Sequence, residues 1–279
     1  TGGTKAAKRT EELLSEMEKS SNRNDHPNVR TYRAVIDAWA KSGARDAGVQ
    51  AERIMERALK RYEQGFHEAE IDTSIYGSVI NAWAKSEGLK AAERVEELLK
   101  EMEVSSNEKI HPNRNVYNAA IDAWAKSGEQ DAGDRAEAVF ERMLERHKQG
   151  YKGLEPDTAC YSAMINAWSK TGGTKAATRA EELLSEMEES KDGRIQPNLK
   201  TYNCMINAWA ESGASDAGIR ADAILERMLK RHNEGFWGLK PNEYTYLTMI
   251  SAWAKTEGAE AAERTKELQM EIEKLKGST

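Results

Sequence analysis

Six tyrosines recur along this 279-residue chain, and each is followed seven residues later by a tryptophan. The tyrosines are Tyr32, Tyr76, Tyr117, Tyr161, Tyr202 and Tyr246, and the tryptophans are Trp39, Trp83, Trp124, Trp168, Trp209 and Trp253. Successive tyrosines are separated by 44, 41, 44, 41 and 44 residues, so the sequence repeats most closely every 85 residues. A fixed period of this length indicates a repeat array, in which stacked units bury their apolar residues against one another.

Each unit begins with one amphipathic helix. In the first unit the apolar residues follow the spacing i, i+3, i+4, i+7, i+8, which predicts one buried stripe; they are Tyr32, Val35, Ile36, Trp39 and Ala40. A glycine that can take the left-handed, helix-ending conformation follows in every unit, at positions 43, 88, 128, 172, 213 and 258. A second amphipathic segment comes next, so the short turns predict antiparallel helix pairs.

We therefore expect an all-α fold of about 13 helices, a right-handed α-solenoid of stacked antiparallel hairpins with first helices lining its concave face. The chain is predicted to be a single array over residues 1–279. It comprises an N-terminal half repeat at 1–27, full repeats at 28–72, 73–113, 114–157, 158–198 and 199–242, and a C-terminal repeat at 243–279. Residues 1–17 nearly duplicate residues 171–187, which predicts that the chain opens within a repeat and is a fragment.

Charge and composition argue against several classes of function. The net charge of -6 is not that of a strongly basic nucleic-acid binder, so a polyanion would need a local basic stripe. Cys160 and Cys204 fall at different points of their repeats, and no Cys/His cluster has metal-ligand spacing, so we expect no metal and no cofactor. Without a membrane-length apolar run, a phosphate loop or a catalytic constellation, we expect no membrane partner, no small-molecule substrate and no enzyme activity.

The recurring unit resembles the pentatricopeptide repeat family. The pattern is Pro-Asn or Pro-Asp, three residues, Tyr-Asn, an apolar pair, a later glycine, and a helix ending in Leu-Leu-x-Glu-Met. Its clearest copies are PNRNVYNAAIDAWAKSG from Pro112 and PNLKTYNCMINAWAESG from Pro197. The units are longer than the family's usual repeat and carry Ala-Trp for its common Gly-Leu, so they look like a long, algal-type variant.

The resemblance implies an RNA-processing protein of mitochondria or plastids that binds single-stranded RNA, one base per repeat. The family reads each base with the residue after the tyrosine and the residue after the proline that closes the repeat. The corresponding pairs are Arg33 with Asp72, Gly77 with Asn113, Asn118 with Asp157, Ser162 with Asn198, and Asn203 with Asn242. The last three pairs fit the family's code for uracil, adenine and a pyrimidine in 5′ to 3′ order, whereas Arg33, Gly77 and Leu247 depart from it.

The residues themselves are suited to this chemistry. Asn118, Asp122 and Lys126 are spaced four apart and share a helix face offset from the Tyr/Trp stripe. Amides and hydroxyls can both donate to and accept from a base edge. One lysine per unit is suited to successive phosphates, at Lys41, Lys85, Lys126, Lys170 and Lys255, with Glu211 in the remaining unit. The alternative is a solvated face whose lysines interact favourably with the helix dipole.

Two other recurring residue types have both a structural and a functional interpretation. The tryptophans could stack on bases, but they share the apolar stripe with the tyrosines, which favours core packing. An arginine recurs in the second helix, at positions 9, 94, 135, 179, 220 and 264, and could bind phosphates. Neighbouring glutamates, such as Glu97 after Arg94 and Glu182 after Arg179, favour ion pairs instead.

We predict a non-catalytic protein that binds single-stranded RNA selectively. The alternative is a different class, a protein-binding helical scaffold or a structural subunit of a larger ribonucleoprotein with protein partners. The acidic net charge, the three departing repeats and Glu211 favour this alternative. An engineered, consensus-like array is a further alternative, suggested by near-identity at a distance of 170 residues and opposed by the irregular reading positions.

Overall fold

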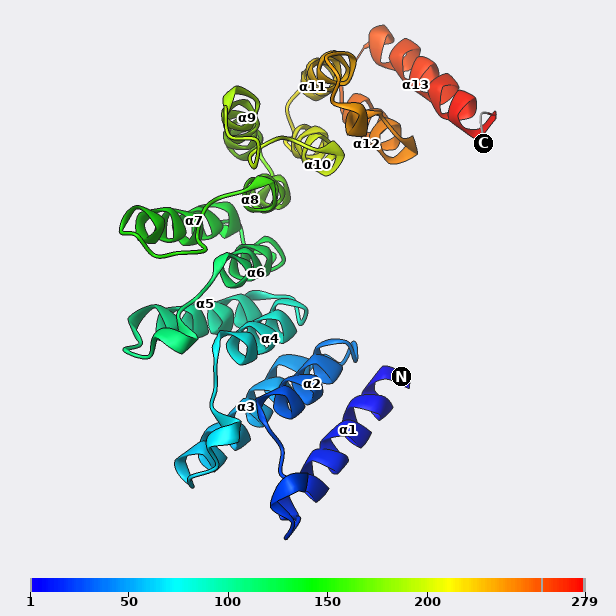
Figure 1. The fold of residues 1–279 in the computed structure, drawn as a ribbon. Helices are drawn as coiled ribbons and strands as arrows, with labels where there is room; N and C mark the ends of the chain where they lie inside the picture. The colour runs from blue at the N-terminus through cyan, green and yellow to red at the C-terminus, as the bar shows by residue number, and fades with distance from the viewer. Residues whose placement is uncertain (1, 257, 278–279) are drawn as a thin grey trace. The chain divides into compact units, whose positions relative to one another are not determined.

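The computed structural model describes residues 2–256 and 258–277. These residues form 13 α-helices and four short 3-10 helices, and none of them lies in a β-strand (Figure 1). Successive helices pair into antiparallel hairpins, as the glycine spacing predicts. The expected all-α solenoid of stacked hairpins is therefore confirmed. None of the helices in the described part of the chain is both long and apolar enough to cross a membrane.

Residue contacts divide the chain into two compact units. Unit 1 comprises Thr1–Ser127 and Arg146–Leu154, and unit 2 comprises Gly128–Glu145 and Glu155–Thr279. Unit 1 contains α1 (Gly2–Lys19), η1 (Arg23–Asp25), α2 (Val29–Ala40), α3 (Ala47–Glu63), η2 (His67–Ala69), α4 (Thr73–Ala84), α5 (Leu89–Val104), η3 (Glu108–Ile110) and α6 (Arg114–Ala125). Unit 2 contains most of α7 (Ala132–Lys148), and then α8 (Thr158–Thr171), α9 (Thr174–Glu189), α10 (Leu199–Ala210), α11 (Ala217–Asn233), η4 (Trp237–Leu239), α12 (Glu243–Trp253) and α13 (Ala259–Gly277).

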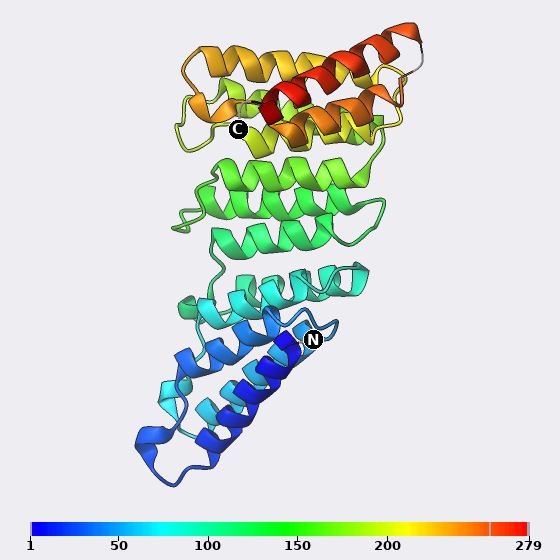
Figure 2. The ribbon, with the colours of Figure 1, turned by 90° about the vertical axis from the view of Figure 1, so that its right-hand side faces the viewer.

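Within each unit the first helices of successive hairpins form a layer. In unit 1, α4 packs between α2 and α6, and in unit 2, α10 packs between α8 and α12 (Figure 2). Each first helix also packs on its own second helix, as α2 does on α3 and α10 on α11. Equivalent positions of successive first helices therefore lie side by side, which is the arrangement needed to read a linear ligand.

The recurring glycines adopt the backbone conformation expected of them. All six have φ between 68° and 125°, a region that L side chains rarely occupy. Gly43, for example, follows α2 at φ 68°, and Gly128 follows α6 at φ 80°. The chain can therefore reverse within a few residues at the end of each first helix, which produces the hairpins.

The recurring tryptophans belong to the core. Five of the six are at most 3% exposed, and Trp83 is half-buried. The indole N–H groups of five of them donate to carboxylates on the preceding second helix, as Trp124 does to Glu96 at 3.0 Å and Trp209 to Glu181 at 2.9 Å, whereas that of Trp168 has no partner among the described residues. Because a buried indole N–H needs an acceptor, these carboxylates fix the ring orientations. Core packing of the tryptophans, rather than base stacking, is confirmed.

Three of the recurring arginines, Arg94, Arg179 and Arg264, join neighbouring second helices. The predicted ion pairs within a helix are present, at 2.6 Å between Arg94 and Glu97 and at 2.8 Å between Arg179 and Glu182. Arg94 also donates to Glu52 of α3, and Arg179 donates to Glu137 of α7. The guanidinium groups are thus occupied by carboxylates from two helices, which confirms their structural interpretation.

A third contact repeats every 85 residues and couples a tyrosine to a glutamate. The hydroxyls of Tyr32, Tyr117 and Tyr202 donate to Glu18, Glu103 and Glu188 at 2.9, 2.7 and 2.6 Å. Burial of Tyr202, assisted by its bond to Glu188, raises the pKa of the phenol well above its ordinary value of 10.0. The neutral tyrosine is therefore a permanent hydrogen-bond donor at physiological pH.

A close approach between a glycine and a tryptophan also follows the 85-residue period. A Cβ atom added to Gly48, Gly133 or Gly218 would lie 2.3, 2.2 or 2.4 Å from the ring of Trp83, Trp168 or Trp253. Each glycine is the second residue of its helix, directly after an alanine. The glycine is needed here because any side chain would enter the volume of the indole.

Candidate functional site

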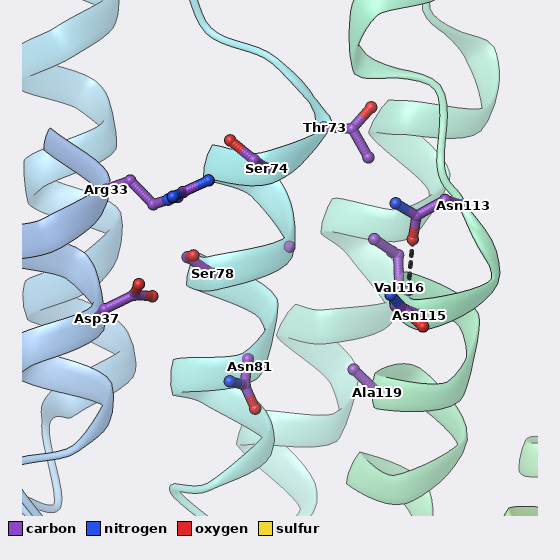
Figure 3. Close-up of a pocket in the computed structure, with 11 residues that line it drawn as sticks. Arg33, Asp37, Thr73, Ser74, Ser78, Asn81, Asn113, Asn115, Val116 and Ala119 are labelled. Atoms are coloured by element: carbon purple, nitrogen blue, oxygen red, sulfur yellow. Dashed lines mark hydrogen bonds between the residues drawn. The ribbon is translucent and has the colours of Figure 1, made fainter. Parts of the chain in front are cut away.

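A groove in unit 1 crosses the first helices α2, α4 and α6 (Figure 3). Its volume is 530 Å³, and three predicted reading positions line it: Arg33, Gly77 and Asn113. In Figure 3 the side chain of Arg33 extends from α2 toward Ser74 at the start of α4, and Asn113 lies at the start of α6. Gly77 leaves the floor of this groove without a side chain, since a Cβ atom there would meet only Val116, at 3.6 Å.

A second groove in unit 2 crosses the equivalent helices α8, α10 and α12. Its volume is 640 Å³, and Asn198, Asn203 and Asn242 line it together. All three are predicted reading residues, and they come from two successive repeats. The structure thus brings both members of the pair Asn203 and Asn242 to one groove, whose rim also carries Lys200 and Tyr244.

The closing residue of each predicted pair caps the next first helix. Asn113, Asn198 and Asn242 accept through Oδ1 from the backbone N–H of Val116, Thr201 and Thr245 at 3.2, 3.0 and 3.0 Å. Asp72 and Asp157 accept in the same way from two N–H groups each. Only an oxygen can accept these bonds, so each asparagine cap turns its NH2 group away from its helix, whereas an aspartate cap offers only acceptors.

Two of the reading residues that follow a tyrosine are held by the next repeat. Ser162 Oγ lies 2.7 Å from Thr201 Oγ1, and Asn203 Oδ1 accepts from Thr245 Oγ1 at 2.9 Å. Ser162 is 4% exposed and Asn203 is 7% exposed. These side chains are therefore ordered before any ligand arrives, instead of sampling several rotamers on an open face.

The third predicted pair spans the two units, because Asn118 belongs to unit 1 and Asp157 to unit 2. Its pairing stays a prediction. Asn118 Oδ1 is buried and has no hydrogen-bond partner within residues 2–256 and 258–277. A buried amide oxygen without a partner is costly, so this position favours any ligand that donates a hydrogen bond.

The five predicted phosphate-contacting lysines have different surroundings. Lys126 pairs with Asp122 on its own helix, and Lys255 donates to the carbonyl oxygen of Ala210 at 2.7 Å and to Glu211 at 3.2 Å. Lys41, Lys85 and Lys170 are exposed and have no ion-pair partner among the described residues. Lys41 and Lys85 cap the C-termini of α2 and α4, where a cation also stabilises the helix dipole.

Sequence reasoning missed four residues of the unit 2 groove and its supports. Thr201 and Thr245 are fully buried behind the reading residues, and Lys200 and Tyr244 line the groove. Their positions in the repeat could have identified them, because each lies two or three residues after a closing asparagine. Within the described residues, no group of three or more His, Cys, Asp or Glu side chains could hold a metal ion.

A family profile described as "Pentacotripeptide-repeat region of PRORP" matches residues 107–256, which is more than half of the chain. The chain belongs to the pentatricopeptide repeat family. The matched residues include both clearest copies of the repeat, at Pro112 and Pro197. Proteins of this family are in general non-catalytic, RNA-binding scaffolds of helical repeats.

A solved structure of this family has the same fold. The crystal structure of the pentatricopeptide repeat protein PPR10 from maize matches 98% of this chain with a TM-score of 0.63 and 22% sequence identity. The matched part is 33% of the maize chain, so this pentatricopeptide repeat chain spans about a third of the length of that protein. No curated protein sequence matches the chain significantly.

Proposed function

We propose that this pentatricopeptide repeat chain is a non-catalytic protein that binds single-stranded RNA base-selectively, one base per repeat, along its layers of first helices. The observation that carries the proposal is the unit 2 groove, which Asn198, Asn203 and Asn242 line together. These three ordered amides belong to the two successive first helices α10 and α12, so they offer polar groups to a linear ligand that runs from one repeat to the next. The maize protein and the family profile support the fold, and the groove supports the ligand class.

The helix caps account for the kind of base that each repeat selects. An asparagine cap presents its NH2 group, which pairs with an acceptor on the base, such as N1 of adenine or N3 of cytosine. An aspartate cap offers acceptors, which pair with the imino N–H of uracil or guanine. These preferences are compatible with the order that the family's code implies for the repeats closed by Asp157, Asn198 and Asn242, which is uracil, adenine and a pyrimidine.

Binding of the phosphate backbone rests on few cations. Lys41, Lys85 and Lys170 are exposed, and Arg33 and Lys200 line the two grooves. Lys126 and Lys255 are partly neutralised by Asp122 and Glu211, and the whole chain carries a net charge of -6. We therefore expect RNA affinity to fall with increasing salt, with a shallow slope that reflects a small number of phosphate contacts. A mitochondrial or plastid location belongs to the same proposal.

Removal of two reading amides tests this proposal. Asn118→Ala/Asn203→Ala should weaken binding of a matched single-stranded RNA by about tenfold, because each lost contact to a base removes roughly 0.5 to 1 kcal/mol. Fluorescence anisotropy with a labelled RNA measures the change. The matched control is Asn24→Ala/Asn233→Ala, which removes two exposed amides outside both grooves and should leave the affinity unchanged.

Two results would contradict the proposal. Equal affinity of the wild type and the Asn118→Ala/Asn203→Ala variant would show that the reading positions do not touch RNA. Absence of binding to every RNA would favour a protein-binding scaffold. The ion pairs of Lys126 with Asp122 and of Lys255 with Glu211 favour the protein-binding scaffold, because they leave fewer unpaired cations along the first helices to bind phosphates.

A further inference from the structure

Two buried threonines connect the two reading residues of one repeat. Thr245 Oγ1 lies 2.9 Å from Asn203 Oδ1 and 3.0 Å from Asn242 Oδ1, and it accepts from the backbone N–H of Asn242 at 3.1 Å. Thr201 occupies the equivalent place, 2.7 Å from Ser162 Oγ and 3.2 Å from Asn198 Oδ1. Both threonines are 0% exposed, so water does not compete for these hydroxyls.

The hydroxyl of Thr245 holds the amide of Asn203 through a hydrogen bond. Asn242 Oδ1 already accepts from the backbone N–H of Thr245 at 3.0 Å, whereas Asn203 Oδ1 has Thr245 Oγ1 as its donor. In the structure the oxygen of Asn203 faces the Thr245 hydroxyl, and Asn203 also lines the unit 2 groove. The NH2 group of Asn203 is therefore the part of the amide that this contact leaves available to a ligand.

We propose that Thr201 and Thr245 are positioning residues that set base selectivity, by holding the side chains of Ser162 and Asn203 in one orientation toward RNA. This inference rests on the proposed function. The threonines themselves do not line the groove, and they act only through the side chains they hold. In the described helices Thr31, Thr201 and Thr245 occupy this place, whereas Ile75, Val116 and Cys160 stand there in the other three repeats.

The chain contains a matched control for this role. Thr31 stands at the same place in α2, three residues after the cap Asn28, and its hydroxyl lies 3.3 Å from Asn28 Oδ1. Thr201 and Thr245 each hold a reading residue of the preceding repeat, but no predicted reading residue comes before Thr31 in the chain. Thr31→Val therefore removes a hydroxyl that contacts the cap residue at the equivalent place without touching a reading residue, and separates loss of stability from loss of selectivity.

The test compares Thr245→Val, Thr245→Ser and Thr31→Val with the wild type. The probes are four labelled single-stranded RNAs that differ only at the base whose preference is lost in Asn203→Ala. Thr245→Val should reduce the preference among the four by about fivefold to tenfold, because the amide loses the donor that orients it. Thr245→Ser keeps the hydroxyl and should retain the base preference of the wild type. Thr31→Val should lower the melting temperature and leave the base preference unchanged.

The outcomes separate the two proposals. A wild type that binds RNA without base preference overturns the proposed function, and this inference with it. A wild type with a preference that Thr245→Val fully retains overturns this inference alone. If Thr245→Val does not fold, Thr201→Val provides a second variant for the same test. Thr201→Val should lose base preference at the adjacent base, the one that Ser162 contacts.

Discussion

Replacement of Gly48 by alanine should lower the free energy of unfolding by about 2 to 3 kcal/mol, although alanine is the better helix former. The new Cβ would lie 2.3 Å from the ring of Trp83, a distance that no Cβ contact tolerates. The ring cannot move away easily, because its indole N–H donates to Glu52 at 3.0 Å and Glu52 also holds Arg94. Urea denaturation followed by circular dichroism measures the change.

Gly77→Ala is the matched control for Gly48→Ala, because both glycines lie in helices of unit 1. The nearest atom to a Cβ at Gly77 is a methyl of Val116 at 3.6 Å, which is an ordinary contact. This substitution should stabilise the helix by up to about 1 kcal/mol. A Gly48→Ala variant as stable as Gly77→Ala would contradict the close packing of the second helices against the tryptophan rings.

Replacement of Glu188 by alanine should destabilise unit 2 by about 2 to 3 kcal/mol. Its carboxylate accepts from Tyr202 at 2.6 Å and from Arg227 at 2.6 and 3.1 Å. The side chains of Arg227 and Glu188 are only 27% and 17% exposed, and Tyr202 is 0% exposed. Removal of the carboxylate leaves a buried hydroxyl and a partly buried guanidinium without this acceptor, and thermal unfolding reports the loss.

Glu12→Ala is the control for Glu188→Ala, because Glu12 also pairs with an arginine, Arg9, on the same kind of second helix. That pair is at 2.9 Å, but its side chains are 60% and 62% exposed. An exposed pair contributes little, so Glu12→Ala should change the stability by less than about 0.5 kcal/mol. Equal losses in the two variants would contradict the view that burial, rather than ion pairing alone, gives Glu188 its effect.

The sequence predicts the fold of this chain well because the repeats restate the same pattern. The apolar stripe with its tyrosine and tryptophan occurs once in each of six units, so a chance resemblance to a helix pattern in one unit is outweighed by the other five. Burial of the tryptophans and the arginine ion pairs also follow from spacing, since residues three to seven apart on a helix have fixed relative positions. Such local geometry needs no knowledge of neighbouring helices.

The candidate site depends on contacts that spacing does not encode. The bonds of Thr201 to Ser162 and of Thr245 to Asn203 join residues 39 and 42 positions apart. Whether two such side chains meet depends on the register between neighbouring helices, to within about an ångström. For the same reason the sequence does not predict that Gly48 lies against the ring of Trp83.

The register of the bound RNA tests base-by-base reading most directly. The measurement is the affinity of the wild type, Ser162→Ala and Asn203→Ala for a set of RNAs that differ from a bound sequence by single bases. We predict that each variant loses preference at one base only, and that the two bases are adjacent, because Ser162 and Asn203 occupy consecutive repeats of unit 2. Loss of preference at the same base in both variants, or at none, would contradict the account.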